Sequence, residues 1–231
     1  MKNLKDTIVE RLHINKDTKS YNYHPKAKYE LKELVYKLIK ERGNDANLND
    51  IDTSEIIDMN ELFCDSDFNG DISEWDVSNV KKMNYMFYRS SFTGENGDIS
   101  NWDVSNVETM ERMFIYSFFN GDISNWNVNN VKKMTWMFYD SKFTGENGDI
   151  SKWNVSNVEN MNYMFAYSKF NGDISEWAVS NVEDMSYMFC DSKFTGENGD
   201  ISKWDVSNVN NMKYMFTGTP LEKNPPKWYK N

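Results

Sequence analysis

The sequence predicts an α/β repeat solenoid in which short parallel strands and short helices alternate behind a helical N-terminal cap. The first observation is self-similarity: one unit, which we call a rung, recurs with its tryptophan spaced alternately 27 and 24 residues apart. The second is that the apolar residues of each rung follow first a strand-like and then a helix-like spacing. One such unit cannot bury its apolar face alone, so successive rungs are expected to stack.

Each rung reads Gly-Asp-Ile-Ser-x-Trp-x-Val-Ser-Asn-Val-x-x-Met-x-x-Met-Phe. A degenerate copy, with Ile51 at the tryptophan position, precedes six clear ones and makes seven rungs over residues 48–217. The loops between rungs alternate between a long FTGENGDIS and a short FNGDIS, so the true period is a pair of rungs. The tryptophans of the clear rungs are Trp75, Trp102, Trp126, Trp153, Trp177 and Trp204.

Within a rung, we expect a very short strand at Ile72 and its equivalents, followed by a short helix. Val80, Met83, Met86 and Phe87 fall within about 120° of one another at the helical spacing of about 100° per residue. Serine followed three residues later by glutamate predicts capping boxes at the helix starts. These pairs are Ser105 and Glu108, Ser156 and Glu159, and Ser180 and Glu183.

The two ends of the array are expected to be capped, because an uncapped end would expose its apolar core. Residues 1–47 form an N-terminal segment whose stripe of apolar residues from Leu31 to Ile39 predicts a helical cap, with a further short helical stretch near residues 7–12. Residues 218–231 form a proline-containing C-terminal cap in which Leu221 and Trp228 would cover the last core layer.

The charge distribution narrows the classes of partner. The chain carries a net charge of −10, but residues 1–43 carry a net +5, which leaves −15 on the remainder. An acidic body repels nucleic-acid phosphates, so we expect no nucleic acid as a partner. No run of 18 apolar residues occurs, which predicts no membrane insertion. Without a recognisable leader, the expected location is cytoplasmic or virion-associated, and the cell surface only if the chain is exported in another way.

The sequence does not predict an enzyme or a cofactor. The two histidines, His13 and His24, lie outside the repeats, and no nucleophile motif, phosphate-binding loop or zinc spacing is present. Carboxylates are abundant but recur in every rung, which indicates architecture, because catalytic carboxylates need one special environment. Cys64 and Cys190 occupy equivalent positions five rungs apart, too distant for a disulfide, and are expected to be free thiols.

The repeated motif at residues 75–87 and 204–216 resembles the BspA-type leucine-rich-repeat family, also met as a repeat in mycoplasma-type lipoproteins. The similarity covers about residues 25–228 and is specific, because six near-identical copies carry it. The resemblance implies a leucine-rich-repeat-like solenoid. It also implies, where members have an assigned role, adhesion at the cell surface to host proteins or other bacteria.

Two columns of residues are candidate sites. The first would project from the helices away from the core, as a row of exposed aromatic side chains at a binding surface does, although rings lying flat against one another would merely stiffen the stack. This column is Tyr85, Arg112, Trp136, Tyr163, Tyr187 and Tyr214, with a second variable column, Tyr88, Ile115, Tyr139, Ala166, Cys190 and Thr217, bordering it.

The second candidate is a weak calcium ladder formed by the aspartate that precedes the isoleucine of each clear rung. Calcium needs about six or more oxygen ligands, whereas one acid per rung is fixed, so the preferred role is a hydrogen bond to the backbone of the aspartate's own turn. The column is Asp71, Asp98, Asp122, Asp149, Asp173 and Asp200.

Together these features predict a non-enzymatic macromolecular recognition module that binds a protein through an extended face. Carbohydrate remains an alternative ligand, because exposed aromatic rings also stack on sugar rings. The alternative functions are a structural or virion-type component that self-associates or packs on a shell or fibre, and an exported surface adhesin.

Overall fold

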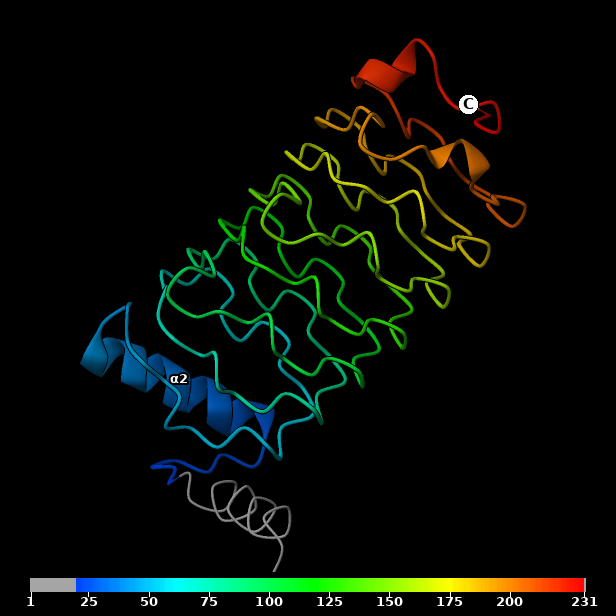
Figure 1. The fold of residues 1–231 in the computed structure, drawn as a ribbon. Coiled ribbons are helices and arrows are strands. Elements are labelled where there is room, and N and C mark those ends of the chain that lie inside the picture. Colours follow the sequence, from blue (N-terminus) through cyan, green and yellow to red (C-terminus); the bar gives the residue numbers. More distant parts are fainter. Residues whose placement is uncertain (1–19, 231) are drawn as a thin grey trace, which may run out of the picture.

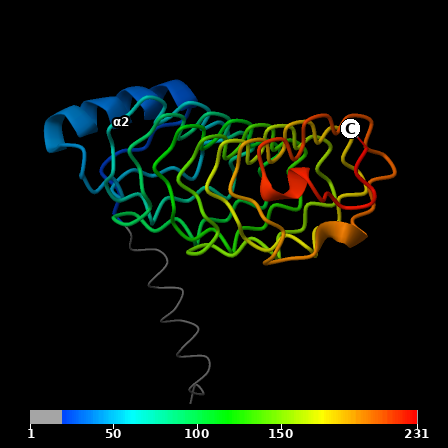
Figure 2. The ribbon, with the colours of Figure 1, turned by 90° about the horizontal axis from the view of Figure 1, so that it is seen from above.

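The computed structural model describes residues 20–230, so the helical stretch expected near residues 7–12 and His13 lie outside the described residues. From there the chain winds through successive rungs that stack along one axis, in sequence order from blue to red (Figure 1). Helix α2 (Lys28–Arg42) lies across one end of this stack, and the two short 3₁₀ helices η1 (Ile201–Lys203) and η2 (Pro220–Glu222) lie at the other. Seen from above, the rungs follow one behind another along the long axis (Figure 2).

The predicted fold class is wrong. Over residues 20–230 the structure contains one α-helix, two 3₁₀ helices and no sheet, and the remainder is turns and irregular backbone. Adjacent rungs are joined by isolated parallel bridges, not by strands. The chain is therefore neither the α/β solenoid of short strands and short helices that the spacing predicted nor the leucine-rich-repeat architecture that the resemblance implied.

The helices fail to form because two residues in each rung adopt a left-handed backbone. Tyr85 has φ 58° and Arg89 has φ 50°, and equivalent residues of the other rungs have similar values. Instead of bonding four residues back, the amide of Met86 donates to the Met83 carbonyl at 3.3 Å. The amide of Tyr88 donates to the Tyr85 carbonyl at 3.1 Å. The segment is thus a run of overlapping four-residue β-turns.

The remaining amides of this segment bond to the next rung. Met83, Tyr85 and Phe87 donate to the carbonyls of residues 109, 111 and 113 at 3.1, 3.0 and 2.9 Å. The amides of this segment thus bond alternately within a turn and to the next rung. Their hydrogen bonds are therefore made without a helix. Six of the parallel bridges run just ahead of the first methionine of each rung, and two more, Tyr23 with Ile51 and Asn47 with Asp71, lie at the N-terminal end of the stack. Seven residues, one from each rung, form the series of six: Asp58, Lys82, Thr109, Lys133, Asn160, Asp184 and Asn211.

The predicted capping boxes are likewise wrong, because no helix follows them. The amide of Ser105 donates to the Asp103 carboxylate at 3.1 Å, which closes a local turn. The amide of Glu108 donates across to the Lys81 carbonyl at 2.9 Å. Ser156 makes the same turn bond to Asn154, and the amides of Glu159 and Glu183 likewise donate to the rung before.

The predicted core residues are buried. Val80, Met83, Met86 and Phe87 are all fully buried, as is Ile72. Phenylalanine rings stack from rung to rung; those of residues 63 and 87 lie 5.5 Å apart and within 2° of parallel. The tryptophans and the valines two residues later are buried as expected, except that Val206 in the last rung is only partly buried. Stacked rings and apolar burial therefore hold neighbouring rungs together.

Helix α2 covers the first end of the stack with its apolar face and pairs its basic residues with the first rung. Leu31, Val35 and Leu38 are buried. Both Arg42 guanidinium nitrogens donate to the Asp50 carboxylate at 2.9 Å. Lysines 28 and 32 reach the carboxylates of residues 58 and 61 at 3.7 and 3.9 Å. Part of the basic charge of residues 1–43 is thus neutralised within the molecule.

Trp228 occupies the tryptophan position of a further rung at the other end. Its ring stacks on that of Trp204 at 6.1 Å, and its indole N–H donates to the Ile201 carbonyl at 2.9 Å. Trp228 follows Trp204 by 24 residues, which continues the alternation of spacings. The C-terminal segment thus extends the tryptophan stack as well as covering it.

Candidate binding surface

The aromatic row, which we define as Tyr85, Arg112, Trp136, Tyr163, Tyr187 and Tyr214, is continuous along the stack. Each member holds the first left-handed position of its rung, so the side chains repeat at the rung spacing. The rings of Trp136 and Tyr163 stack at 4.1 Å, and those of Tyr163 and Tyr187 at 4.4 Å. The row is half-buried apart from Tyr214, which is exposed. Its members thus support one another while part of each side chain stays accessible to solvent.

Arg112 joins the row instead of interrupting it. Its guanidinium carbon lies 5.3 Å from the ring centre of Tyr85 and 5.9 Å from that of Trp136. One terminal nitrogen donates to the Tyr85 hydroxyl at 2.6 Å. Cation–π attraction to two rings and one hydrogen bond therefore fix the orientation of this cation.

A second set of rings, which we call the outer row, runs beside the first. Its members meet mostly edge to face: Tyr88 and Tyr116 at 6.1 Å, Tyr116 and Tyr139 at 5.6 Å, and Tyr139 and Tyr167 at 5.3 Å. Contacts between Trp136 and Tyr139 at 4.6 Å join the two rows. The sequence placed residues 88 and 139 beside the surface but did not single out residues 116 and 167.

Between the rows lies a cavity of about 350 Å³, the aromatic hollow. Ile115 is its one buried lining residue. Arg89 lies beside it, with its guanidinium carbon 5.1 and 5.5 Å from the ring centres of Tyr88 and Tyr116. The volume suits one or two side chains or a small ligand. Its lining residues are Tyr85, Tyr88, Arg112, Ile115, Tyr116, Trp136 and Tyr139.

Sequence reasoning missed Arg89, Tyr116 and Tyr167. They share the second left-handed position of the rung, which three other rungs fill with aspartate and the last with Gly218. Because aspartate and glycine tolerate a left-handed backbone better than bulky residues do, arginine and tyrosine depart from the pattern there. That departure is the signal in the sequence that marks these positions.

Three phenols of this surface, those of Tyr139, Tyr163 and Tyr167, have raised pKa values and are protonated at neutral pH. Burial, together with the neighbouring Tyr116 and Tyr167, raises the pKa of Tyr139 to about 12. Burial and Tyr187 raise the pKa of Tyr163, and a hydrogen bond to Asp191 raises that of Tyr167. These hydroxyls therefore act as hydrogen-bond donors or acceptors and do not supply negative charge.

The aspartates of the candidate calcium column bind their own turns. Each carboxylate accepts the amide of the serine two residues on, at 2.8 or 2.9 Å. Within the described residues no group of three or more histidine, cysteine or acidic side chains is placed to hold a metal ion. These bonds are the local turn contacts that the sequence indicated as the alternative to calcium binding.

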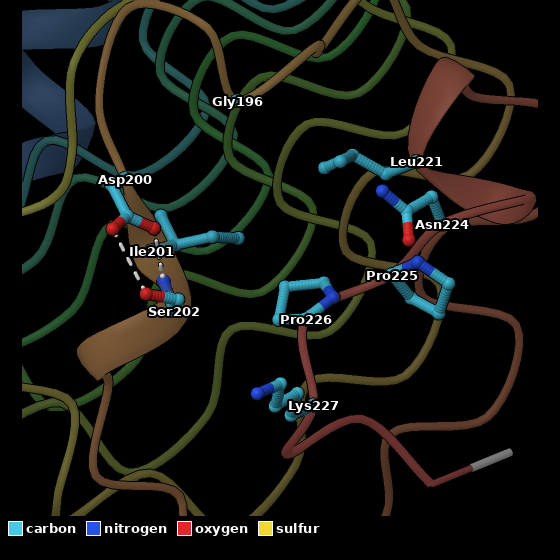
Figure 3. A pocket seen from close by; sticks show the side chains of 9 residues that line it. All are labelled: Gly196, Asp200, Ile201, Ser202, Leu221, Asn224, Pro225, Pro226 and Lys227. Atoms are coloured by element: carbon cyan, nitrogen blue, oxygen red, sulfur yellow. Dashed lines mark hydrogen bonds between the residues drawn. The ribbon is translucent and has the colours of Figure 1, made fainter.

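A larger cavity, of about 460 Å³, lies where the C-terminal segment folds back on η1. Ile201 projects from one side, with Leu221, Asn224 and Pro226 across the space (Figure 3). Asp200, at its edge, accepts the amide and hydroxyl of Ser202 at 2.8 and 2.9 Å, and these bonds lower the pKa of Asp200. The one carboxylate that lines this cavity is therefore already bonded within its own turn. The cavity is the space left where the C-terminal segment packs on the last rung.

The two cysteines offer no activated thiol. Both are free, as predicted. Burial and the adjacent aspartate raise the pKa of Cys64 to about 11 and that of Cys190 to about 12. A nucleophilic cysteine requires the opposite shift, because the thiolate is the reactive form.

Comparison with known proteins identifies the family. The family described as "Mycoplasma protein of unknown function, DUF285" matches residues 30–146 and again residues 118–228. The chain belongs to this family. The two DUF285 matches overlap and together include every rung from the first to the last, with the aromatic row lying within them. No curated protein and no solved structure matches the chain. No helix in the described part of this DUF285 protein has the length and apolar character needed to cross a bilayer.

Proposed function

We propose that this DUF285 protein is a non-enzymatic recognition module that binds a partner protein through the surface formed by the aromatic row and the outer row. The observation that carries the proposal is the aromatic hollow, where Trp136, four tyrosines and Arg112 line one open cavity. Tryptophan, tyrosine and arginine are the residues most enriched at the energetic centres of protein interfaces. Their entropic cost on binding is small here, because the rings already stack in place.

The repeat itself argues for binding and against catalysis. The surface side chains of the rows repeat with the rungs, so they present an extended face and not one isolated reactive centre. The free thiols have raised pKa values, which disfavours nucleophilic chemistry.

We also propose kinship with the BspA-type repeats. The motif at residues 75–87 and 204–216 resembles BspA-type repeats, some of which serve in adhesion. On that kinship the partner would be a protein on another cell, and the module would act after export. Self-association and carbohydrate binding are the outcomes against which this proposal is tested.

The test is affinity capture by the purified chain from cell lysate and surface extract, followed by measurement of direct binding to each retained protein. A variant carrying Tyr85→Ala, Tyr163→Ala and Tyr187→Ala removes three rings of the aromatic row. The matched control is Tyr29→Ala with Tyr36→Ala, since both tyrosines are exposed on α2 and belong to neither row. Circular dichroism checks that each variant folds.

We expect one protein to bind the parent and the α2 control equally and to bind the triple variant at least about tenfold more weakly. Equal binding by all three would show that the row only stiffens the stack. Mass that rises with concentration and depends on the row would favour self-association. Row-dependent retention of glycans alone would favour a carbohydrate-binding module.

A further inference from the structure

Arginine is concentrated at one place in the rungs. Residues 48–217 contain two arginines, Arg89 and Arg112, although lysine is frequent throughout. Both lie at the aromatic hollow: Arg112 lines it, and Arg89 covers two of its lining tyrosines. Arginine differs from lysine in presenting a planar fork of donors that matches a carboxylate.

Both arginines also break the repeat. Arg112 stands where the next four rungs carry tryptophan or tyrosine, and Arg89 stands where equivalent rungs carry aspartate, tyrosine or glycine. Residues that recur in every rung build the rung, whereas these two are not needed for that purpose. Two independent departures from the repeat meet at one cavity. We infer that both arginines serve this cavity and not the stacking of the rungs.

The Arg112 guanidinium is held in place with donors to spare. It makes one hydrogen bond, to the Tyr85 hydroxyl, and over residues 20–230 no carboxylate lies within ion-pair distance of it. Arg89 has a loose and exposed contact with the Asp65 carboxylate at 3.9 Å. An incoming carboxylate could therefore bond to Arg112 without displacing an existing ion pair, and to Arg89 at little cost.

We propose that the aromatic hollow binds an acidic segment of a partner protein. One aspartate or glutamate carboxylate pairs with Arg112 and Arg89, and an adjacent apolar or aromatic side chain packs against Trp136 and Tyr139 over Ile115. This inference rests on the proposed function and specifies its partner. A cationic ligand is disfavoured by the two guanidiniums, although aromatic walls alone would suit one. A polyanion is disfavoured by the acidic body of the chain.

The test is selection of a random twelve-residue peptide display library on the intact protein. Parallel selections use Arg89→Gln with Arg112→Gln, which removes the charge, and the triple tyrosine variant described above. Calorimetry then compares each enriched peptide with the same peptide carrying glutamine or asparagine at its acidic positions. The second measurement uses the parent protein, so it does not depend on whether the arginine variant folds.

We expect peptides with aspartate or glutamate beside an apolar or aromatic residue, which lose about tenfold or more in affinity when neutralised. They should be lost with the double arginine variant. Peptides that need the tyrosines but not acidic residues would overturn this inference and leave the proposed function standing. Absence of any tyrosine-dependent peptide would count against both. Preferential binding of a panel of acidic oligosaccharides over every peptide would overturn the protein partner.

Discussion

The indole N–H of Trp228 donates to the carbonyl of Ile201, 27 residues earlier, at 2.9 Å. The Trp204 indole makes the equivalent bond to Ile174 at 3.2 Å, and so does every earlier tryptophan of the stack to the rung before it. The C-terminal segment therefore uses the same inter-rung contact as the array. Stability in a stacked repeat comes from such neighbour contacts.

Replacing Trp228 should consequently destabilise the last rung. Trp228→Ala removes both the ring that packs on Trp204 and the indole bond, and we expect a loss of about 2 kcal/mol in the free energy of unfolding, less than for a fully buried tryptophan. Trp228→Phe keeps a ring and loses the bond, so about half that loss is expected. Urea unfolding measures both. Equal stability of Trp228→Ala and the parent would show that the segment does not support the stack.

The left-handed backbone at Asp140 separates the observed turn from the predicted helix. Asp140 has φ 46° and is exposed. Asp140→Val should lower the free energy of unfolding by about 1–2 kcal/mol, because a β-branched residue is strained there. Asp140→Gly should be tolerated, as the equivalent Gly218 is in the last rung. A helix would give the reverse order, since glycine is the poorer helix former. Thermal melting of the two variants decides between them.

The Asp50–Arg42 pair predicts how stability depends on pH. Hydrogen bonds from Arg42 hold the pKa of Asp50 below its ordinary value. Because the pKa of Asp50 is lower in the folded protein, the pair contributes fully to the free energy of unfolding above the unfolded pKa, near 3.9. This contribution is lost as the pH falls through the folded pKa. Asp50→Asn should therefore lower the melting temperature at pH 7. It should also reduce the difference between the melting temperatures at pH 7 and pH 3. The neighbouring Asp45→Asn serves as control. An unchanged difference for Asp50→Asn would contradict the pairing.

Cys190 should be slow to react. Burial and Asp191 raise its pKa to about 12, and the side chain is buried, so little thiolate is present at pH 8. We expect labelling by a disulfide reagent to be on the order of a hundredfold slower in the folded protein than in urea. The more accessible Cys64, with a pKa of about 11, should react faster. Single serine variants assign the two rates. Rapid labelling of Cys190 in the folded protein would contradict its burial.

The sequence carried the order of the rungs and the identity of the core, but not the local backbone. Apolar residues at 80, 83, 86 and 87 are buried in overlapping turns as readily as on a helix, so their spacing did not distinguish the two. The left-handed φ of Tyr85 is what makes this segment a turn and not a helix. Tyrosine rarely adopts that conformation, and the inter-rung hydrogen bonds impose it here. A single rung cannot reveal a constraint that its neighbour supplies.

The aromatic row could be found because Tyr163 and its equivalents recur at one position. The aromatic hollow could not, because it depends on where Arg89 and Tyr116 lie relative to the next rung. The position of Trp228 was available from the spacing of 24 residues after Trp204 but was obscured by the prolines before it.

The most direct test of the central claim is hydroxyl-radical footprinting of the chain alone and with its captured partner. If the two rows are the binding surface, Tyr116, Trp136 and Tyr139 should lose at least about half of their oxidation rate in the complex. Tyr29 and Tyr36 on α2 should keep theirs. Protection of the α2 tyrosines with unchanged oxidation at the aromatic hollow would place the partner elsewhere and contradict the account.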